Sequence, residues 1–496
     1  MLNLLTSSQT READKFTIEH QPISSINLME SAAKAFINIF TAEFPYADIA
    51  VSIYCGTGNN GGDGLAIARL LKQRGYQQVD IHIIRFSEKS SPDFEINLER
   101  LSDTDIPVKE IRDSDFPSAD ADVIIDAILG SGLNKPLSGD WKLLADHLNS
   151  LNKKIIAVDI PTGFPSEGVI DPEAAAVKAD LAISFQRPKI NFFFPESQEV
   201  INRFEVAEIG LDEIFIQSQK SDWKLIIEDD IRQILKPRKQ FSHKGTYGHA
   251  LIIAGRKETM GAALLCSESC LYTGAGLTTA CISEEGLSAL NTRAPEIMAL
   301  LRKDSRFTLP DLQKYTAIAA GPGLGTDDTS VTLIKDLLAG FSKPLVLDAD
   351  ALNILATHPG WMSRLPQGSV LTPHMKEFDR LFGDHDNFWK RLETAKMQSA
   401  RLKIFIILKN RYTFIVSPDK QVFINPTGSP AMATGGMGDV LTGMIVAFMA
   451  QGYEPLQASI LGTYIHGSCG QYSGYVCTAS ELIKSIPGVM EGFLRK

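Results

Sequence analysis

Short runs of β-branched and aliphatic residues alternate with helical patterns along the whole chain, and this alternation limits the folds open to it. The first series contains AVSIYCG, VDIHIIRF, VIIDAILG and KKIIAVDIPTG, with helical segments such as LAIARLLKQRG and WKLLADHLNSL between them. Strands that alternate with helices predict a parallel sheet with crossover helices. Ligands of such sheets bind beyond the carboxyl ends of the strands, so we expect the functional residues on the loops there.

A polar, aperiodic segment divides the alternation into two series. Residues 217–224, QSQKSDWK, precede a second series that includes HALIIAGR, LTTACI, YTAIAAGPGLG, KPLVLDADALNIL and KIFIILKN. The chain has 496 residues, whereas single cores stop growing at roughly 250 to 300 residues. We therefore predict two α/β domains, residues 1–216 and residues 225–496.

Charge and composition exclude several classes of protein. The formal net charge of −10 gives no general attraction for nucleic acid, so an anionic ligand must be held locally by amides, a few cations or a metal. No segment approaches the roughly 18 to 20 apolar residues of a membrane span, and no secretory signal is readable. The six cysteines are scattered without a CxxC pair, which favours buried free thiols. We expect a cytoplasmic protein with no nucleic-acid or membrane partner.

A glycine-rich loop follows the first of these strands. Residues 56–61 match G-x-G-x-x-G, which is the pattern of a dinucleotide-binding turn. The acidic residue expected at the end of the next strand is absent, because Asp80 stands at the beginning of VDIHIIRF. We therefore reject the dinucleotide interpretation. A turn without a ligand is the alternative for this loop taken alone.

Polar residues also end two further strands of the first half. Asp126 in VIIDAILG and Asp159 in AVDIPTG should converge on one crevice with the glycine loop. The oxygens of Asn60, Asp126 and Thr162 are hard ligands suited to an alkali or alkaline-earth cation. Residues 130–133, GSGL, can expose successive amides to a pyrophosphate, although a simple strand-to-helix turn is the alternative.

The segments CGTGNNGGDGLAIARLL, VIIDAILGSGL and VDIPTG resemble the loops of the YjeF N-terminal family, the NAD(P)H-hydrate epimerases. The resemblance covers about residues 1–216 and implies a Rossmann-like three-layer domain that binds hydrated NADH and NADPH. It implies a potassium ion held by Asn60, Asp126 and Thr162. It also implies contacts between the hydrated coenzyme and Asn59, Asn60, Gly61, Gly62, Asp63, Gly130, Ser131, Gly132, Leu133, Asn134, Lys135, Pro136 and Asp159.

Inversion of a hydrated coenzyme requires a proton carrier. The hydroxyl lies on a carbon next to the ring nitrogen, which can help to expel it before water adds to the other face. A positioned carboxylate that moves the proton is worth about 10²- to 10⁴-fold in rate. We predict that Asp159 has this role. Asp126 is the alternative, but a carboxylate that neutralises a cation is held ionised and is a poorer proton donor.

The densest motif of the chain is ATGGMGDVLTG at residues 433–443, which leads into an apolar helix. Bare amides at a helix N-terminus bind phosphate oxygens. Asp439 beside such an anion hole can accept the proton of an attacking hydroxyl. A capped helix with glycines for close packing is the alternative. No GxxxxGK[ST] loop is present, which excludes a P-loop nucleotide site.

GGMGD resembles the anion hole of ribokinase-like kinases, and HKGTYGHALIIAG, GPGLG, VLDADALN and LTPHMKEFDRL narrow the resemblance to the ADP- or ATP-dependent NAD(P)H-hydrate dehydratases. It covers residues 225–496 and implies a ribokinase-like three-layer domain. It implies coenzyme contacts from Ala262, Gly325, His374 and Asp439. It implies nucleotide contacts from Lys409, Asn410, Arg411, Tyr412, Thr413 and Gly438. A hydrogen-bonded structural residue is the alternative for His374, and magnesium is expected where a nucleotide phosphate is transferred.

Both resemblances together predict an enzyme that repairs hydrated nicotinamide coenzymes. One half would interconvert the R and S forms of hydrated NADH and NADPH, and the other would phosphorylate the ring hydroxyl with ADP or ATP and release phosphate. We expect ADP as the nucleotide, because the resemblance implies that fused versions are bacterial, and we expect a homo-oligomer. The alternatives are a vitamin or sugar kinase in the second half and a non-catalytic binding scaffold in the first.

Overall fold

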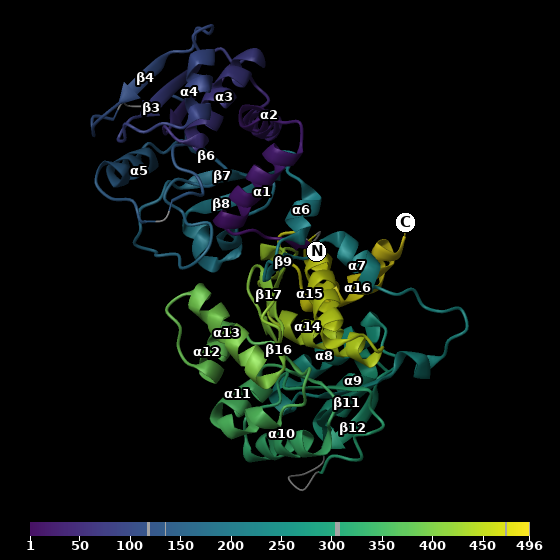
Figure 1. Cartoon of the computed structure of the whole chain (residues 1–496). Helices are drawn as coiled ribbons and strands as arrows, with labels where there is room; N and C mark the ends of the chain where they lie inside the picture. Colours follow the sequence, from purple (N-terminus) through teal and green to yellow (C-terminus); the bar gives the residue numbers. More distant parts are fainter. Residues whose placement is uncertain (117–119, 134, 303–307, 472–473, 496) are drawn as a thin grey trace. The chain divides into compact units, whose positions relative to one another are not determined.

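The backbone divides into two compact units, each described here by itself. The computed structural model describes every residue except 117–119, 134, 303–307, 472–473 and 496 (Figure 1). The N-terminal unit comprises residues 3–221 with 387–389, and the C-terminal unit comprises residues 1–2, 222–386 and 390–496.

A parallel sheet of seven strands forms the centre of the N-terminal unit. Its order is β4-β3-β2-β5-β6-β7-β8, and every neighbouring pair runs parallel. The strands are β2 (Val51–Cys55), β3 (Val79–Ile84), β4 (Val108–Ile111), β5 (Val123–Ala127), β6 (Lys154–Val158), β7 (Ala179–Phe185) and β8 (Ile201–Ala207). The parallel sheet expected from the alternation in the sequence is confirmed.

Helices cover both faces of this sheet. The helices are α1 (Ser7–His20), α2 (Ser25–Glu43), α3 (Asn59–Gln73), α4 (Pro92–Arg100), α5 (Asp140–Ser150) and α6 (Glu213–Ser218). Residues of α2 and α3 share one core with alternate residues of the strands, such as Ile53 and Ile125. Residues of α5 share a second core with the residues between them, such as Ile124. The result is the three-layer arrangement expected for this half.

The C-terminal unit has an eleven-stranded sheet with the order β1-β9-β18-β17-β16-β15-β14-β13-β10-β11-β12. The strands are β1 (Leu2–Asn3), β9 (Trp223–Leu225), β10 (His249–Ile253), β11 (Leu277–Ser283), β12 (Met298–Arg302), β13 (Ala317–Ala320), β14 (Leu345–Leu347), β15 (Val370–Leu371), β16 (Phe405–Leu408), β17 (Thr413–Val416) and β18 (Val422–Asn425). From β12 to β16 the neighbours run parallel, whereas β17 is antiparallel to β16 and β18. The β16–β17 hairpin places the KNRYT segment at a turn.

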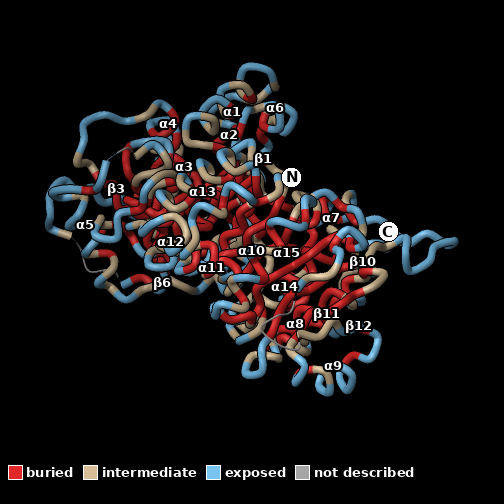
Figure 2. The backbone as a smooth tube through the Cα atoms, turned by 90° about the horizontal axis from the view of Figure 1, so that it is seen from below, coloured by how far each residue is buried: buried red, intermediate tan, exposed pale blue. Residues whose placement is uncertain are grey.

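The helices of the C-terminal unit form layers on both sides of its sheet (Figure 1). They are α7 (Glu228–Ile234), α8 (Met260–Thr273), α9 (Leu287–Arg293), α10 (Asp328–Gly340), α11 (Asp350–Thr357), α12 (Met375–Phe382), α13 (Phe388–Leu402), α14 (Met437–Ala450), α15 (Pro455–Gln471) and α16 (Ala479–Leu494). Helices α8, α14, α15 and α16 pack together over alternate residues of the strands, such as Ala250 and Ile252. Helix α14 is buried along almost its whole length (Figure 2).

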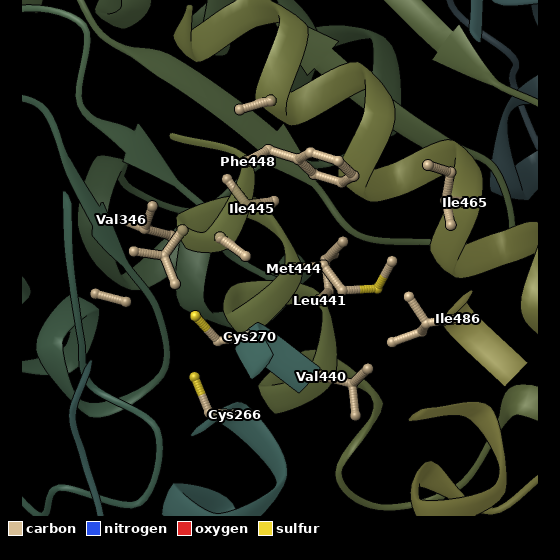
Figure 3. Close-up of a cluster of buried hydrophobic side chains, with 14 of the residues drawn as sticks. Cys266, Cys270, Val346, Val440, Leu441, Met444, Ile445, Phe448, Ile465 and Ile486 are labelled. Atoms are coloured by element: carbon tan, nitrogen blue, oxygen red, sulfur yellow. The ribbon is translucent and has the colours of Figure 1, made fainter. Parts of the chain in front are cut away.

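Close packing of α14 against α8 holds the glycine-rich loop in place. The side chains of Val440, Leu441 and Met444 lie in the same core as Cys266 and Cys270 of α8 (Figure 3). A Cβ atom at Gly443 would lie 2.0 Å from the Ser269 Oγ and 2.1 Å from the Cys266 carbonyl oxygen, so only glycine permits this approach. All six cysteines are free and buried, as expected. None of the helices in the described part of the chain is long and apolar enough to cross a membrane.

Candidate active sites

A cavity of about 470 Å³ lies at the carboxyl ends of β2, β5 and β6 in the N-terminal unit. Parallel strands end at the same edge of a sheet, so the loops after these strands meet there. The cavity is lined by most of the residues expected to contact the coenzyme: Asn59, Asn60, Asp63, Gly130, Ser131, Gly132, Leu133 and Asp159. The structure therefore brings together loops that lie up to about a hundred residues apart in the sequence.

Other residues expected to contact the coenzyme do not line this cavity, and their contact with it stays a prediction. A Cβ atom at Gly61 would lie 1.6 Å from the Gly56 carbonyl oxygen, and one at Gly62 would lie 2.9 Å from the Met29 Sδ. These glycines therefore serve close packing. Lys135 and Pro136 are exposed and are not part of the cavity wall, and Asn134 lies outside the described residues.

The residues expected to hold a cation lie where the β5 and β6 loops meet. Asp126 is fully buried; its Oδ1 accepts a hydrogen bond of 2.7 Å from the Thr162 Oγ1, and its Oδ2 accepts one of 2.7 Å from the Thr162 amide. The buried Asn60 Nδ2 has no partner among the described residues, and a Cβ atom at Gly130 would lie 3.4 Å from the Asn60 Oδ1. Burial raises the pKa of Asp126 to about 6, although the hydrogen bonds from Thr162 and Ile128 lower it. The donor set fits a hard cation in chemical kind.

Asp159 is the first residue after β6, and its backbone has a φ of +64°. Its Oδ1 lies 2.6 Å from the Lys189 Nζ and accepts a hydrogen bond of 3.0 Å from the Phe185 amide. Lys189 is 5% exposed, so this ammonium is a buried partner of the carboxylate. Lys189 was missed in the sequence, because a lone lysine in QRPKIN is typical of solvated surface.

Two further carboxylates face the same cavity. Burial raises the pKa of Asp63 well above its ordinary value, and the negative charges of Asp159, Asp14 and Asp93 raise it further. Burial also raises the pKa of Asp14 on α1 to about 6, while Lys189 lowers it and Asp159 raises it. Asp14 was not recognised from the sequence as a candidate.

In the C-terminal unit the glycine run 435–438 forms the N-terminus of α14. Gly436 has a φ of +90° and precedes the helix, which begins at Met437. Asp439 lies in the first turn of α14 beside Asp348, which follows β14. Such a left-handed residue before a helix turns the free amides of the first turn toward a common point.

Asp348 and Lys409 form an ion pair beside Asp439. The Lys409 Nζ lies 2.7 Å from the Asp348 Oδ1, and the Thr442 Oγ1 donates a hydrogen bond of 2.8 Å to the Asp348 Oδ2. A Cβ atom at Gly438 would lie 3.3 Å from the Lys409 Nζ, so the glycine run directly faces this pair. Asp348 and Thr442 were missed as individual residues, although VLDADALN and GDVLTG were singled out as segments.

The environment of Asp439 suits a general base. Burial raises its pKa to about 7, the charges of Asp348 and Asp350 raise it, and Lys409 lowers it. A carboxyl with a pKa near neutrality can both accept and release a proton at the working pH. The arrangement can therefore remove a proton from a hydroxyl while amides and Lys409 hold phosphate oxygens.

The other residues expected in this half lie on the loops around this cluster. The Gly325 amide donates a hydrogen bond of 2.8 Å to the Asp350 Oδ2, and a Cβ atom at Gly323 would lie 3.0 Å from the Cβ of Ala262. The Lys409 amide donates to the Pro373 carbonyl at 3.1 Å, which places residues 409–413 beside the LTPH segment.

His374 has a structural role that the sequence had left as the alternative. Its Nδ1 accepts hydrogen bonds from the amides of Lys376 at 3.1 Å and Glu377 at 3.3 Å, and it thereby caps α12. The Glu377 Oε2 accepts a hydrogen bond of 2.9 Å from the His374 amide in return. Contact of His374 with the coenzyme stays a prediction.

Comparison with known proteins relates both halves to one class. A family model described as "YjeF-related protein N-terminus" matches residues 25–191, and one described as "NAD(P)H-hydrate dehydratase" matches residues 250–487. The solved structure of a ribokinase-like superfamily protein from Enterococcus faecalis superposes with a TM-score of 0.52 and 27% identity, over 56% of this chain and 99% of that one. Fold and sites thus define a two-domain α/β enzyme with a ribokinase-like second half.

Full-length relatives narrow this class to one family. The chain is 32% identical to a "Bifunctional NAD(P)H-hydrate repair enzyme Nnr" of Moorella thermoacetica, over 98% of this chain and 96% of the relative. It is 33% identical to the protein of the same name from Escherichia coli, over 89% of this chain and 84% of the relative. The chain belongs to the family of bifunctional NAD(P)H-hydrate repair enzymes, and the predicted family and fold class are confirmed.

Proposed function

We propose that this chain interconverts the R and S forms of hydrated NADH and NADPH in its N-terminal unit and dehydrates the S form in its C-terminal unit with ADP as the preferred nucleotide. The observation that carries the proposal is the group formed by Asp439, Lys409 and the glycine run at the start of α14. This group combines a base poised near neutrality with an anion hole. A vitamin or sugar kinase and a non-catalytic first half are the less favoured alternatives, since the full-length relatives are repair enzymes.

The residues of the C-terminal unit would act in a defined order. Asp439 removes the proton from the ring hydroxyl, whose oxygen attacks the terminal phosphorus of the nucleotide. The amides of residues 436–438 and the ammonium of Lys409 stabilise the charge on the transferring group. The phosphate group then leaves the ring carbon as inorganic phosphate, because phosphate is a far better leaving group than hydroxide and the ring nitrogen supplies the electron pair. Loss of a proton from the neighbouring ring carbon to solvent then restores the ring double bond and the electron pair of the nitrogen, which gives NADH or NADPH.

Metal ions complete the proposal for both halves. Asn60, Asp126 and Thr162 would hold a potassium ion, which would keep the β5 and β6 loops in register around the coenzyme. Magnesium would be held mainly by the nucleotide phosphates and would neutralise their charge. A cytoplasmic location and a homo-oligomer are also part of the proposal; cell fractionation and light scattering of the purified chain test them.

The direct test uses the full chain and separated R and S forms of hydrated NADH. With the S form, ADP should restore the near-ultraviolet absorbance of NADH, and ATP should do so more slowly. With the R form, recovery should require epimerisation first. Asp439→Asn should lower nucleotide-dependent recovery by about 10²-fold while epimerisation continues, because only the proton acceptor is lost. Asp159→Asn should instead slow epimerisation, while nucleotide-dependent recovery from the S form continues.

Two results would refute the proposal. If neither nucleotide restores NADH from the S form, while a vitamin or sugar is phosphorylated, the C-terminal unit is a kinase. If the R and S forms interconvert no faster with the chain than without it, the N-terminal unit is a binding scaffold. Normal recovery by Asp439→Asn would remove Asp439 from the mechanism.

A further inference from the structure

Asp14 of α1 borders two adjoining cavities of the N-terminal unit. One is the cavity of about 470 Å³ described above, and the other has about 410 Å³. The two share the residues Arg11, Asp14, Asn59, Asp63, Phe185 and Ile209. Asp14 therefore borders both the cavity lined by residues expected to contact the hydrated coenzyme and a second, adjoining cavity.

The carboxyl of Asp14 differs from that of Asp159 in its partners. Asp159 is paired with the Lys189 ammonium at 2.6 Å and accepts a hydrogen bond from the Phe185 amide. Asp14 has no hydrogen-bond or ion-pair partner within the described residues, and neither has Asp63. A carboxyl without donors retains its proton more readily than one held by an ammonium.

Charged groups approach Asp14 from each element packed around it. On α1 itself these are Arg11, Lys15 and Glu19. From α3 and α4 they are Asp63 and Asp93, and from the segments after β6 and β7 they are Asp159 and Lys189. Lys189 is the nearest buried cation, and it is already paired with Asp159. Acidic groups therefore dominate the interior side of Asp14.

Asp63 and Asp14 thus differ in how readily each can release and regain a proton. Burial first, and then the neighbouring carboxylates, raise the pKa of Asp63 well above its ordinary value. Burial raises the pKa of Asp14 only to about 6, because Lys189 opposes it, and its partial exposure allows exchange with solvent. A proton donor must be recharged in every cycle, which favours Asp14 over Asp63.

We propose that Asp14 is the general acid of the epimerisation and Asp159 is its general base. This inference rests on the proposed function of the N-terminal unit. Asp14 donates its proton to the ring hydroxyl, the carbon–oxygen bond breaks, the ring nitrogen forms a double bond to that carbon, and water leaves. A water molecule then adds to the other face, its proton passes to Asp159, and the electron pair returns to the nitrogen.

The cycle closes because the two carboxyls exchange their protons with solvent. One proton leaves Asp14 and one reaches Asp159, so the substrate has the same composition before and after. The second cavity also borders Asp14, which is partly exposed and can exchange its proton with bulk water.

The test compares Asp14→Asn, Asp14→Glu and the control Glu19→Gln in the full chain. Glu19 lies on the same helix and borders only the second cavity. Asp14→Asn should lower kcat for epimerisation by about 10²-fold with little change in KM. Asp14→Glu should recover part of that loss, and Glu19→Gln should behave as the wild type. Nucleotide-dependent dehydration of the S form should be unchanged in all three, which shows that the C-terminal unit is folded, and the partial recovery in Asp14→Glu shows the same for the N-terminal unit.

The pH profile gives a readout that a merely structural role would not move. Asp14 acts in its protonated form, so kcat/KM of the wild type should fall as the pH rises through about 6. The falling limb should be absent in Asp14→Asn and present in Asp14→Glu. If the wild type epimerises and Asp14→Asn has a normal kcat, this inference alone is overturned. The same holds if the pH profile of Asp14→Asn is that of the wild type. A wild type that does not epimerise overturns the proposed function instead.

Discussion

The chain contains two glycine-rich loops that each lead into a helix, and their glycines serve different purposes. In the loop before α3, a Cβ atom at Gly56 would lie 2.0 Å from the Ile128 carbonyl oxygen, and one at Gly61 would lie 1.6 Å from the Gly56 carbonyl oxygen. In the loop before α14, a Cβ atom at Gly435 would meet nothing within 4 Å, and one at Gly438 would approach the Lys409 ammonium.

The difference separates two reasons for glycine that the sequence cannot distinguish. Before α3, glycine lets the backbone of one loop approach that of the next, so that polar side chains such as Asn60 and Asp63 reach the cavity. Before α14, glycine at positions 435 and 438 leaves the amides themselves open to a ligand, whereas a Cβ atom at Gly436 would lie 2.5 Å from the Leu265 Cδ1. The first site is built from side chains, and the second is built largely from backbone.

The largest expected effect is on the packed loop. Gly61→Ala should destabilise the N-terminal unit by about 3 kcal/mol or more, because its Cβ would overlap a backbone oxygen that cannot move aside. Urea unfolding with a probe of the N-terminal unit measures this change. Gly58→Ala is the matched control, since a Cβ atom there would meet nothing within 4 Å. Equal stability of the two variants would contradict the packing role.

A smaller effect is expected in the open loop, on activity rather than stability. Gly438→Ala should lower kcat/KM for dehydration by about 10-fold, or roughly 1.4 kcal/mol, because its methyl group would face Lys409 and the phosphate. Its thermal stability should match the wild type. Gly443→Ala on the same helix is the control: it should lose stability, since its Cβ would overlap the Cys266 carbonyl oxygen. If Gly438→Ala also melts early, the two loops do not differ as described.

The smallest expected effect is a change in pH dependence. Asp439 acts as a base when ionised, so kcat for dehydration should rise with pH through about 7. Asp348→Asn removes a negative charge that raises the pKa of Asp439, so the midpoint should move to lower pH. Asp384→Asn, at an exposed position, should leave it in place. A midpoint that stays or rises in Asp348→Asn would show that Asp348 does not set the charge state of Asp439.

The sequence predicted the residues that follow strands better than those that reach the sites from elsewhere. Asp126 and Asp159 stand at the ends of β5 and β6, which meet at one edge of a sheet, and Asp439 belongs to a glycine motif at the start of α14. Lys189 and Asp14 come from a loop and a helix whose distance from that edge depends on tertiary packing. A charged residue in such a segment is usually solvated, so nothing in the local pattern marked either one.

The roles of individual glycines could not be predicted for a related reason. Gly61 and Gly62 belong to the same NNGGD run as Asn60 and Asp63, and the resemblance therefore implied that all of them contact the coenzyme. The close approach of Gly61 to Gly56 and of Gly62 to Met29 depends on tertiary packing, which the run itself does not reveal. The antiparallel strand β17 was likewise not recognised, because Thr413–Val416 is short and follows a turn.

The left-handed backbone at Asp159 shows that a favourable ion pair can outweigh local strain. A non-glycine residue held at a positive φ costs about 1 to 3 kcal/mol relative to an unstrained one. Glycine would adopt the same φ without strain, but it would leave the Lys189 ammonium buried and unpaired, which costs about 3 to 5 kcal/mol. A screen of variants for heat resistance alone should therefore retain Asp159, although its backbone conformation is one that glycine adopts more easily.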